Sequence, residues 1–190
     1  MSNLDTVYGQ ALSGSVNNPG LPIALAQLVT AQSQHESANY TSDVFNNSNN
    51  VFGYGYDASS QYQTGSYNGY GTYGSINDSV QEIVDYIYRR QADGQFPDLQ
   101  TITTATQYAT YLKDVTSPGP YFAAPLSQYI SGITSYLGQD NFSSVASAAA
   151  ATPSGSSSAA AVVTEAGISG GGVLILIAIG VGLWYLFRKK

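Results

Sequence analysis

The most constraining feature of this sequence is an uncharged, strongly apolar stretch near its C-terminus. Residues 167–187 carry no charge, and residues 173–187 read VLILIAIGVGLWYLF directly before three basic residues. A helix over residues 167–187 spans about 31 Å, close to the hydrocarbon thickness of a bilayer. Trp184 and Tyr185 beside a basic end are typical of a membrane interface. The pattern predicts one transmembrane helix, with its basic end on the cytoplasmic side or on the equivalent face of a virus membrane.

Composition divides the rest of the sequence into two further parts. Residues 143–164, SSVASAAAATPSGSSSAAAVVT, contain no charged or aromatic residue and therefore predict a flexible linker. Residues 1–142 then form the functional domain, and residues 165–190 form the membrane anchor. The N-terminus has neither a basic cluster nor an early apolar run, so we expect no cleavable secretory signal.

Charge and composition exclude several classes of function. The chain has 12 acidic residues against 6 basic ones, and three of the basic residues stand at its C-terminal end. The strongly acidic remainder repels phosphates, so we expect no nucleic-acid partner. No cysteine is present, and His35 is the single histidine. A zinc site or a Ser-His-Asp triad would have to depend on that one residue, so we expect neither. We expect neither a metal nor a cofactor.

Hydrophobic periodicity predicts a mainly α domain. A stripe of apolar residues that ends in Gln32 and Glu36 predicts a helix from about residue 22 to residue 36. Similar patterns predict helices over residues 76–92, 104–114 and 125–137. Residues 51–74 instead hold six tyrosines and six glycines, a composition that favours irregular β-hairpins.

Glu36 is the strongest candidate for chemistry. It ends a helix on the face that packs inward, and burial raises the pKa of a carboxyl group so that it stays protonated near neutral pH. Such an acid can donate a proton to a glycosidic oxygen. Tyr54, Tyr56 and Tyr62 in the following segment are candidates for stacking on sugar rings. The competing interpretation is a solvated acid beside a tyrosine-rich loop that binds no ligand.

Four elements, in order along the chain, resemble a known family. They are AQSQHESA (31–38) paired with NNVFG (49–53), then YGSINDSV (73–80), YATYL (108–112) and GPYFA (119–123). This series is similar to the signature of glycoside hydrolase family 73, the peptidoglycan glucosaminidases. Two positions depart from it: Ala38 stands where the family commonly has glycine, and Ala124 stands where an aspartate commonly precedes the proline.

The resemblance implies a lysozyme-like fold, in which an α lobe and a small β lobe flank a groove for the glycan. It implies that Glu36 is the general acid. The candidate substrate-binding residues are Asn50, Phe52, Gly53, Tyr54, Tyr56, Tyr108 and Tyr121, with Asn49 in the same turn. The second carboxylate stays open: Asp57 is the first candidate, and Asp43 and Asp78 are alternatives.

Together these expectations describe a membrane-anchored peptidoglycan hydrolase that cleaves the β-1,4 glycan backbone. Its partners are glycan strands and a lipid bilayer, in a bacterial envelope or in the membrane of a phage particle, where capsid proteins are further partners. We favour the phage virion, because a small chain without an export signal needs another route to the cell wall. Two alternatives stay open: a lytic transglycosylase, for which one acid suffices, and a noncatalytic structural or glycan-binding protein on the same scaffold.

Overall fold

The structure is a computed structural model that describes residues 2–116 and 119–139. These residues belong to one compact unit, Met1–Pro153. The predicted linker at 143–164 and the predicted anchor at 165–190 lie outside the described residues. None of the helices within 2–116 and 119–139 combines the length and the apolar character needed to cross a bilayer.

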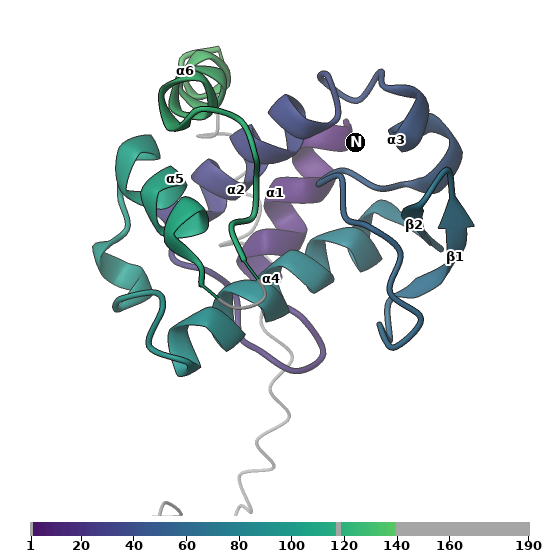
Figure 1. The fold of residues 1–190 in the computed structure, drawn as a ribbon, viewed down its shortest axis with the longest axis horizontal. Helices are drawn as coiled ribbons and strands as arrows, with labels where there is room; N and C mark the ends of the chain where they lie inside the picture. The colour runs from purple at the N-terminus through teal and green to yellow at the C-terminus, as the bar shows by residue number, and fades with distance from the viewer. Residues whose placement is uncertain (1, 117–118, 140–190) are drawn as a thin grey trace, which may run out of the picture. The chain divides into compact units, whose positions relative to one another are not determined.

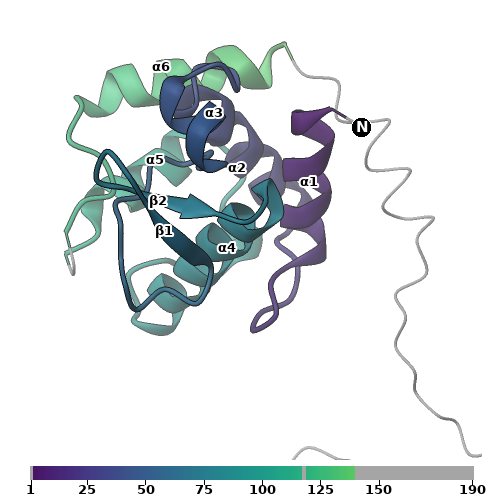
Figure 2. The same cartoon turned by 90° about the vertical axis from the view of Figure 1, so that its right-hand side faces the viewer.

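The domain is mainly helical, as predicted, with one small β-hairpin (Figure 1). In chain order the elements are α1 (Asn3–Ser13), α2 (Ile23–Glu36), α3 (Asp43–Ser48), β1 (Gln63–Tyr67), β2 (Tyr70–Tyr73), α4 (Ile76–Ala92), the 3-10 helix η1 (Leu99–Thr101), α5 (Ala105–Asp114) and α6 (Leu126–Leu137). The helix α1 contacts α2 and α4, and α6 contacts α2 and α5. The hairpin lies on the opposite side of the domain from α5, as Figures 1 and 2 both show.

The four predicted helices are confirmed to within one residue at each end. Side-chain caps explain several of their starts: Thr104 and Gln107 form a capping box at α5, and Ser75 caps α4. Periodicity alone does not predict the short helices α1 and α3. Their N-cap residues, Ser2 and Ser42, are the sequence signals that mark them.

Over its second half the helix α2 is buried on all sides, not along a single stripe. Its buried residues are Leu25, Ala26, Leu28, Val29, Thr30, Ala31, Gln32, Ser33 and Gln34. The expectation of one inward stripe is therefore too narrow, because α1, α5 and α6 all contact this helix. Gly132 of α6 allows one close approach, since a Cβ there would lie 2.4 Å from the His35 ring. Glu36 thus ends a helix that other helices enclose.

The tyrosine-rich segment contains the predicted hairpin. The strands β1 and β2 are antiparallel, with Tyr67 opposite Tyr70, and Asn68 and Gly69 form the turn with φ angles of 51° and 84°. An Asn-Gly turn with two positive φ angles suits the right-handed twist of a hairpin. At the other end of β2, the Tyr73 hydroxyl donates a hydrogen bond to Glu82 of α4. This contact attaches the hairpin to the helical part of the domain.

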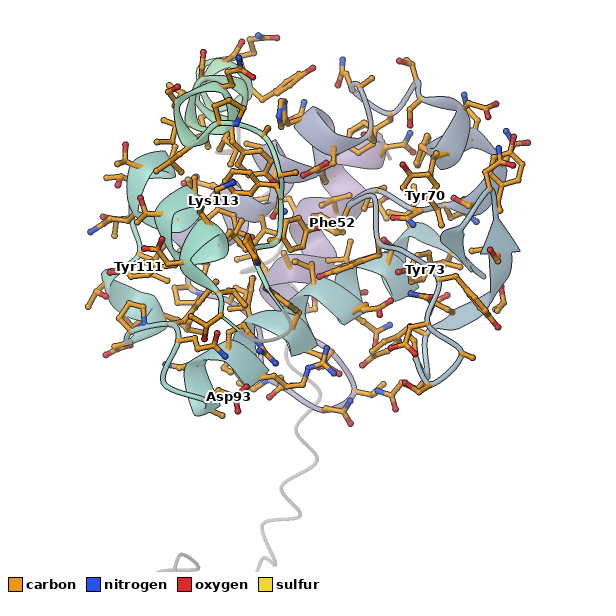
Figure 3. All side chains as sticks on the ribbon, viewed as in Figure 1. Phe52, Tyr70, Tyr73, Asp93, Tyr111 and Lys113 are labelled. Carbon is orange, nitrogen blue, oxygen red and sulfur yellow. The ribbon has the colours of Figure 1, made fainter. Side chains whose placement is uncertain are left out.

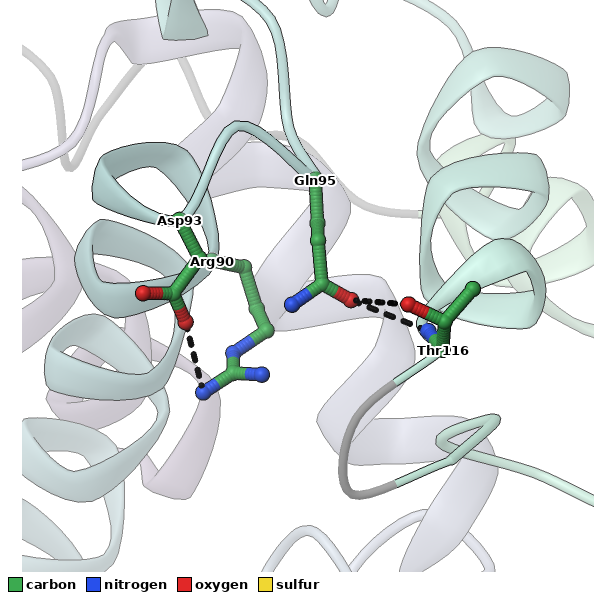
Figure 4. A network of polar contacts seen from close by, with 4 residues as sticks. All are labelled: Arg90, Asp93, Gln95 and Thr116. Atoms are coloured by element: carbon green, nitrogen blue, oxygen red, sulfur yellow. Dashed lines mark hydrogen bonds and ion pairs between the residues drawn. The ribbon is translucent and has the colours of Figure 1, made fainter.

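The ends of α4 and α5 are joined through the loop between them (Figure 4). Arg90 and Asp93 form an ion pair at 3.1 Å at the end of α4. A few residues later, Gln95 Oε1 accepts a hydrogen bond of 2.9 Å from the backbone N–H of Thr116. The side chain of Gln95 therefore fixes the position at which the chain leaves α5.

The turn after α2 contains backbone strain. Ala38, Asn39 and Tyr40 have consecutive left-handed φ angles of 52°, 55° and 61°. Asparagine tolerates this conformation well, whereas a Cβ at alanine or tyrosine costs about 1–2 kcal/mol there. Ala38 is the position at which the resembling family commonly has glycine, the residue that adopts such angles without strain.

We expect Ala38→Gly to raise the free energy of unfolding by about 1 kcal/mol, because the relieved strain exceeds the extra freedom that glycine gives to the unfolded chain. Urea denaturation of the full chain measures the change. Ala24→Gly within α2 is the matched control and is expected to lower stability by about 0.5–1 kcal/mol. A loss of stability in Ala38→Gly would contradict the strain at this turn.

Candidate functional site

A cleft with a volume of about 480 Å³ opens beside the C-terminal end of α2. This volume lies in the range of about 300–1,000 Å³ that is typical of ligand sites. The lining residues are His35, Glu36, Phe52, Gly53, Tyr54, Gly55, Tyr86, Gly119, Pro120, Tyr121, Phe122, Ala123, Ala124 and Tyr129. In Figure 3, Phe52 lies near the centre of the view, between Lys113 of α5 and Tyr73 of the hairpin. The cleft therefore joins segments that are far apart in the sequence.

The two carboxyl oxygens of Glu36 have different surroundings. Oε1 accepts a hydrogen bond of 2.5 Å from the Tyr129 hydroxyl of α6. Oε2 accepts no hydrogen bond from the described residues, and it lies 3.6 Å from the point that a Cβ on Gly53 would occupy. Because Gly53 has no side chain, this second oxygen stays open on the side of the cleft.

The environment of Glu36 favours its protonated form. Burial raises the pKa of the Glu36 carboxyl above its ordinary value, and the hydrogen bond from Tyr129 partly opposes this shift by stabilising the carboxylate. The direction agrees with the expectation from the sequence for an acid at the end of a core-facing helix. A carboxyl group in such a setting can act as a proton donor near neutral pH.

Glu36 is connected to the core by a series of hydrogen bonds below the cleft. The Tyr108 hydroxyl donates to Gln32 Oε1 at 2.6 Å, and Gln32 Nε2 donates to the Tyr129 hydroxyl at 3.1 Å. Tyr108 and Gln32 are both fully buried. Tyr108 therefore does not line the cleft, and the direct glycan contact that the resemblance implies for it is not supported. It reaches Glu36 only through Gln32 and Tyr129.

The turn after α3 forms one wall of the cleft, and Asn50 holds that turn together. Its Nδ2 donates to the backbone oxygens of Tyr54 and Gly71, and its Oδ1 accepts from the backbone N–H groups of Phe52 and Tyr54. The Asn50 side chain is buried and fully used in these bonds, so it shapes the wall and is not exposed to a ligand. Gly53 has a φ of 66°, a conformation that favours glycine.

Three tyrosines that line the cleft contact one another and form an aromatic wall. The ring centroids of Tyr54 and Tyr121 lie 5.6 Å apart, and those of Tyr86 and Tyr121 lie 5.7 Å apart. The Tyr54 hydroxyl is buried and has no hydrogen-bond partner among the residues that the structure describes. Tyr54 and Tyr121 are sequence-predicted members of the site. Tyr86 of α4 is an addition, because it flanks the apolar stripe of that helix and carries no motif.

Residues 119–124, which include Tyr121, also line the cleft, and Lys113 of α5 holds this segment in place. The Lys113 ammonium donates hydrogen bonds to the backbone oxygens of Phe122, Ala123 and Ala124. The Tyr121 hydroxyl donates to the backbone oxygen of Phe52 at 2.8 Å, which connects this segment to the turn after α3. No sequence motif marks Lys113 for this role.

Two aromatic side chains surround Tyr129 and so determine where its hydroxyl lies. The Phe122 ring stacks on the Tyr129 ring with centroids 3.7 Å apart. The His35 ring contacts Tyr129 edge to face, with centroids 5.2 Å apart. Burial lowers the pKa of His35, so the neutral imidazole is favoured. His35 is thus a packing residue at the edge of the cleft.

The structure does not place the other predicted acids in this cleft. Asp57 is exposed, accepts hydrogen bonds from Ser59, and lines a separate hollow of about 360 Å³ beside Tyr62 and Glu82. The alternative candidates are used elsewhere: Asp43 accepts from the Tyr67 hydroxyl, and Asp78 accepts from Ser75. Tyr56 is 50% exposed and lies outside the cleft as well. Among the residues that line the cleft, Glu36 is the sole carboxylate.

A comparison of the chain with protein-family models, with curated proteins and with solved structures finds no match in any of the three. Within residues 2–116 and 119–139, no group of three or more acidic or histidine side chains is arranged to hold a metal ion. The chemistry of the cleft therefore has to be argued from its own side chains.

The raised pKa of Glu36 has a consequence for stability. A raised folded-state pKa means that the folded protein binds this proton more tightly than the unfolded chain does. The stabilisation is full below the unfolded pKa and is lost as the pH rises through the folded pKa. We expect Glu36→Gln to be more stable than the wild type above that range, because glutamine removes the cost of a buried charge.

Thermal unfolding of the full chain over a series of pH values measures this effect. The stability difference between Glu36→Gln and the wild type is expected to decrease in acid. Asp114→Asn, at the exposed end of α5, controls for the loss of one carboxylate. A difference that stays constant from acid to neutral pH would contradict the perturbed carboxyl.

Proposed function

We propose that this chain cleaves the β-1,4 glycan backbone of peptidoglycan, with Glu36 as the general acid. The proposal rests on one observation: a carboxyl group whose pKa burial raises lies in an aromatic cleft, with one oxygen bound to Tyr129 and the other open. We also propose that the fold is lysozyme-like. A helical part and a small β-hairpin part beside a cleft support that description.

The geometry around Glu36 suits proton donation to a glycosidic oxygen. Since Oε1 accepts the hydrogen bond from Tyr129, the acidic proton resides on Oε2, the oxygen beside Gly53. The proton moves to the glycosidic oxygen as the bond from that oxygen to the sugar C1 breaks, and the bonding electron pair stays on the leaving oxygen. When a hydroxyl group or a water molecule attacks C1, the carboxylate of Glu36 accepts its proton.

The absence of a second carboxylate from the cleft lining favours a mechanism with one acid. Inverting enzymes need a second carboxylate to activate water, and retaining enzymes need a nucleophile close to the acid. Neither group is among the residues that line this cleft. The attacking group then comes from the substrate, either as the N-acetyl group of the sugar or as its own hydroxyl, as in a lytic transglycosylase. The presence of a single carboxylate among the lining residues is the observation that favours the lytic transglycosylase as a second candidate function.

Aromatic and backbone groups on the walls suit a sugar. Tyr54, Tyr86 and Tyr121 present apolar ring surface, on which the C–H face of a pyranose can stack. The carbonyl-rich segment 119–124 borders the same cleft.

The location of the protein is a separate proposal that rests on sequence alone. The uncharged apolar residues 167–187 fit a membrane anchor, and the Ser/Ala-rich residues 143–164 fit a linker between anchor and domain. We propose that the domain is tethered to a virion or envelope membrane and acts on nearby glycan strands. Detection in purified virions, with loss of the signal after removal of the membrane, would support a virion location.

We expect Glu36→Gln to lower the rate of glycan cleavage on the order of 10²- to 10⁴-fold, because the substitution keeps the shape and removes the transferable proton. Zymography on purified cell walls and a soluble-product assay with the full chain measure this loss. Asp57→Asn is the matched control and is expected to keep its activity. Equal clearing by Glu36→Gln and wild type would exclude the catalytic role, and a loss in Asp57→Asn as large as in Glu36→Gln would make Asp57 the second carboxylate. Mass spectrometry of the products separates the two mechanisms, since a transglycosylase product is lighter by one water molecule.

We expect Gly53→Ala to lower the turnover rate on the order of tenfold or more, because the new methyl group lies over Glu36 Oε2 and displaces the scissile bond. The left-handed φ of Gly53 adds a stability cost of about 1–2 kcal/mol. Gly69→Ala in the hairpin turn is the matched control: it has a φ of 84° and no atom within 4 Å of the added Cβ. Gly69→Ala should lose stability and keep its turnover rate. If both variants lose the same fraction of activity, strain alone explains the effect.

A further inference from the structure

The direction of the hydrogen bonds below the cleft follows from the burial of Tyr108. Its hydroxyl is fully buried, and Gln32 is its hydrogen-bond partner. A buried O–H group without an acceptor is costly, so the Tyr108 hydrogen goes to an oxygen. The oxygen within reach is Gln32 Oε1, at 2.6 Å. Tyr108 therefore fixes which end of the Gln32 amide faces it.

The fixed amide then determines what the Tyr129 hydroxyl can do. With Oε1 turned to Tyr108, Gln32 presents Nε2 to Tyr129 and donates a hydrogen bond of 3.1 Å to its hydroxyl oxygen. An amide nitrogen cannot accept a hydrogen bond, so the Tyr129 hydrogen points away from Gln32. It points to Glu36 Oε1, at 2.5 Å. A reversed amide would take up that hydrogen and leave Glu36 without it.

We propose that Gln32 is a positioning residue for the reaction: its amide, oriented by Tyr108, makes Tyr129 a permanent donor to Glu36 Oε1, so that the transferable proton is always on Oε2. The inference rests on the proposed function and deepens it. Through Tyr129, Gln32 also stabilises the carboxylate that remains after the proton has left. Gln32 contacts Tyr108 through Oε1 and Tyr129 through Nε2, and it acts on Glu36 through Tyr129 without touching the substrate.

The other titratable groups around Glu36 come from every element that forms the cleft. They are His35 on α2, Tyr54 after α3, Tyr86 on α4, Tyr108 on α5, Tyr121 in the segment 119–124 and Tyr129 on α6. Burial raises the pKa values of these tyrosines, so they stay neutral where Glu36 titrates. His35 is the one group among them that can gain a charge in the same range, and it has to be followed separately.

The test is a nuclear magnetic resonance titration of the Glu36 side-chain carboxyl carbon in the full chain, with the His35 ring followed in the same samples. Gln32→Met keeps the volume and removes both hydrogen bonds. We expect it to raise the pKa of Glu36, because the Tyr129 hydroxyl loses the hydrogen bond from Gln32 Nε2 that strengthens it as a donor to the carboxylate. Tyr129→Phe should raise that pKa further, and Gln32→Met added to Tyr129→Phe should produce no additional shift.

Controls separate orientation from packing. Gln34→Met changes the same residue type on the same helix, two positions away, and should leave the pKa of Glu36 unchanged. Tyr108→Phe removes a single oxygen and frees the amide to reverse, so it should shift the pKa in the same direction as Gln32→Met. This second variant keeps the inference testable if Gln32→Met does not fold.

The outcomes are distinct from those that bear on the proposed function. A folded Gln32→Met with an unchanged Glu36 pKa would overturn the inference, as would additive shifts in Gln32→Met and Tyr129→Phe. If the wild type cleaves glycan, the alkaline limb of its turnover profile should move to higher pH in Gln32→Met and Tyr108→Phe. A wild type that is inactive on cell walls would overturn the proposed function, while the carboxyl titration would still decide whether Gln32 orients Tyr129.

Discussion

The enclosure of α2 by other helices is the constraint on which the cleft depends. Every side chain of α2 over residues 28–34 is buried, so a carboxyl group at its last residue enters largely desolvated surroundings. The close contact of Gly132 with His35 keeps α6 near this end of α2. It also brings Tyr129 of α6 within hydrogen-bonding distance of Glu36. Desolvation of the acid and its specific partner thus have the same origin in the packing of two helices.

Much of the fold could be predicted from the sequence, because short-range sequence patterns determine where helices and turns form. Caps such as Thr104 and turn pairs such as Asn68-Gly69 act over a few residues, and the apolar pattern before Glu36 predicts that it faces inward. The partners of Glu36 are different in kind. Tyr129 lies 93 positions away from Glu36 in the sequence. Their contact depends on how α6 packs on α2, and hydrophobic periodicity does not predict that packing. The positions of Asp57 outside the cleft and of Tyr108 below it also depend on tertiary packing, so the sequence pattern did not predict them.

One group of buried polar side chains lies directly below the cleft. Gln32 and the Tyr108 hydroxyl sit among apolar side chains, where an unpaired polar group would be costly, yet each has a partner. Apolar side chains of the same size would fill this space at least as well. Polar residues kept in such a position make sense when the direction of their hydrogen bonds matters. The free-energy cost of burying Gln32 and the Tyr108 hydroxyl is then linked to the protonation state of Glu36, to which they are connected through Tyr129.

The tyrosine at position 121 has a consequence for which ligands can enter. Its backbone is attached to α5 through Leu112, and its hydroxyl is attached to the opposite wall at Phe52. Lys113 secures the neighbouring carbonyls, so neither wall can swing outward without breaking several bonds at once. The Tyr121 side chain thus connects two walls of the cleft, and a ligand has to fit the opening between them as it stands.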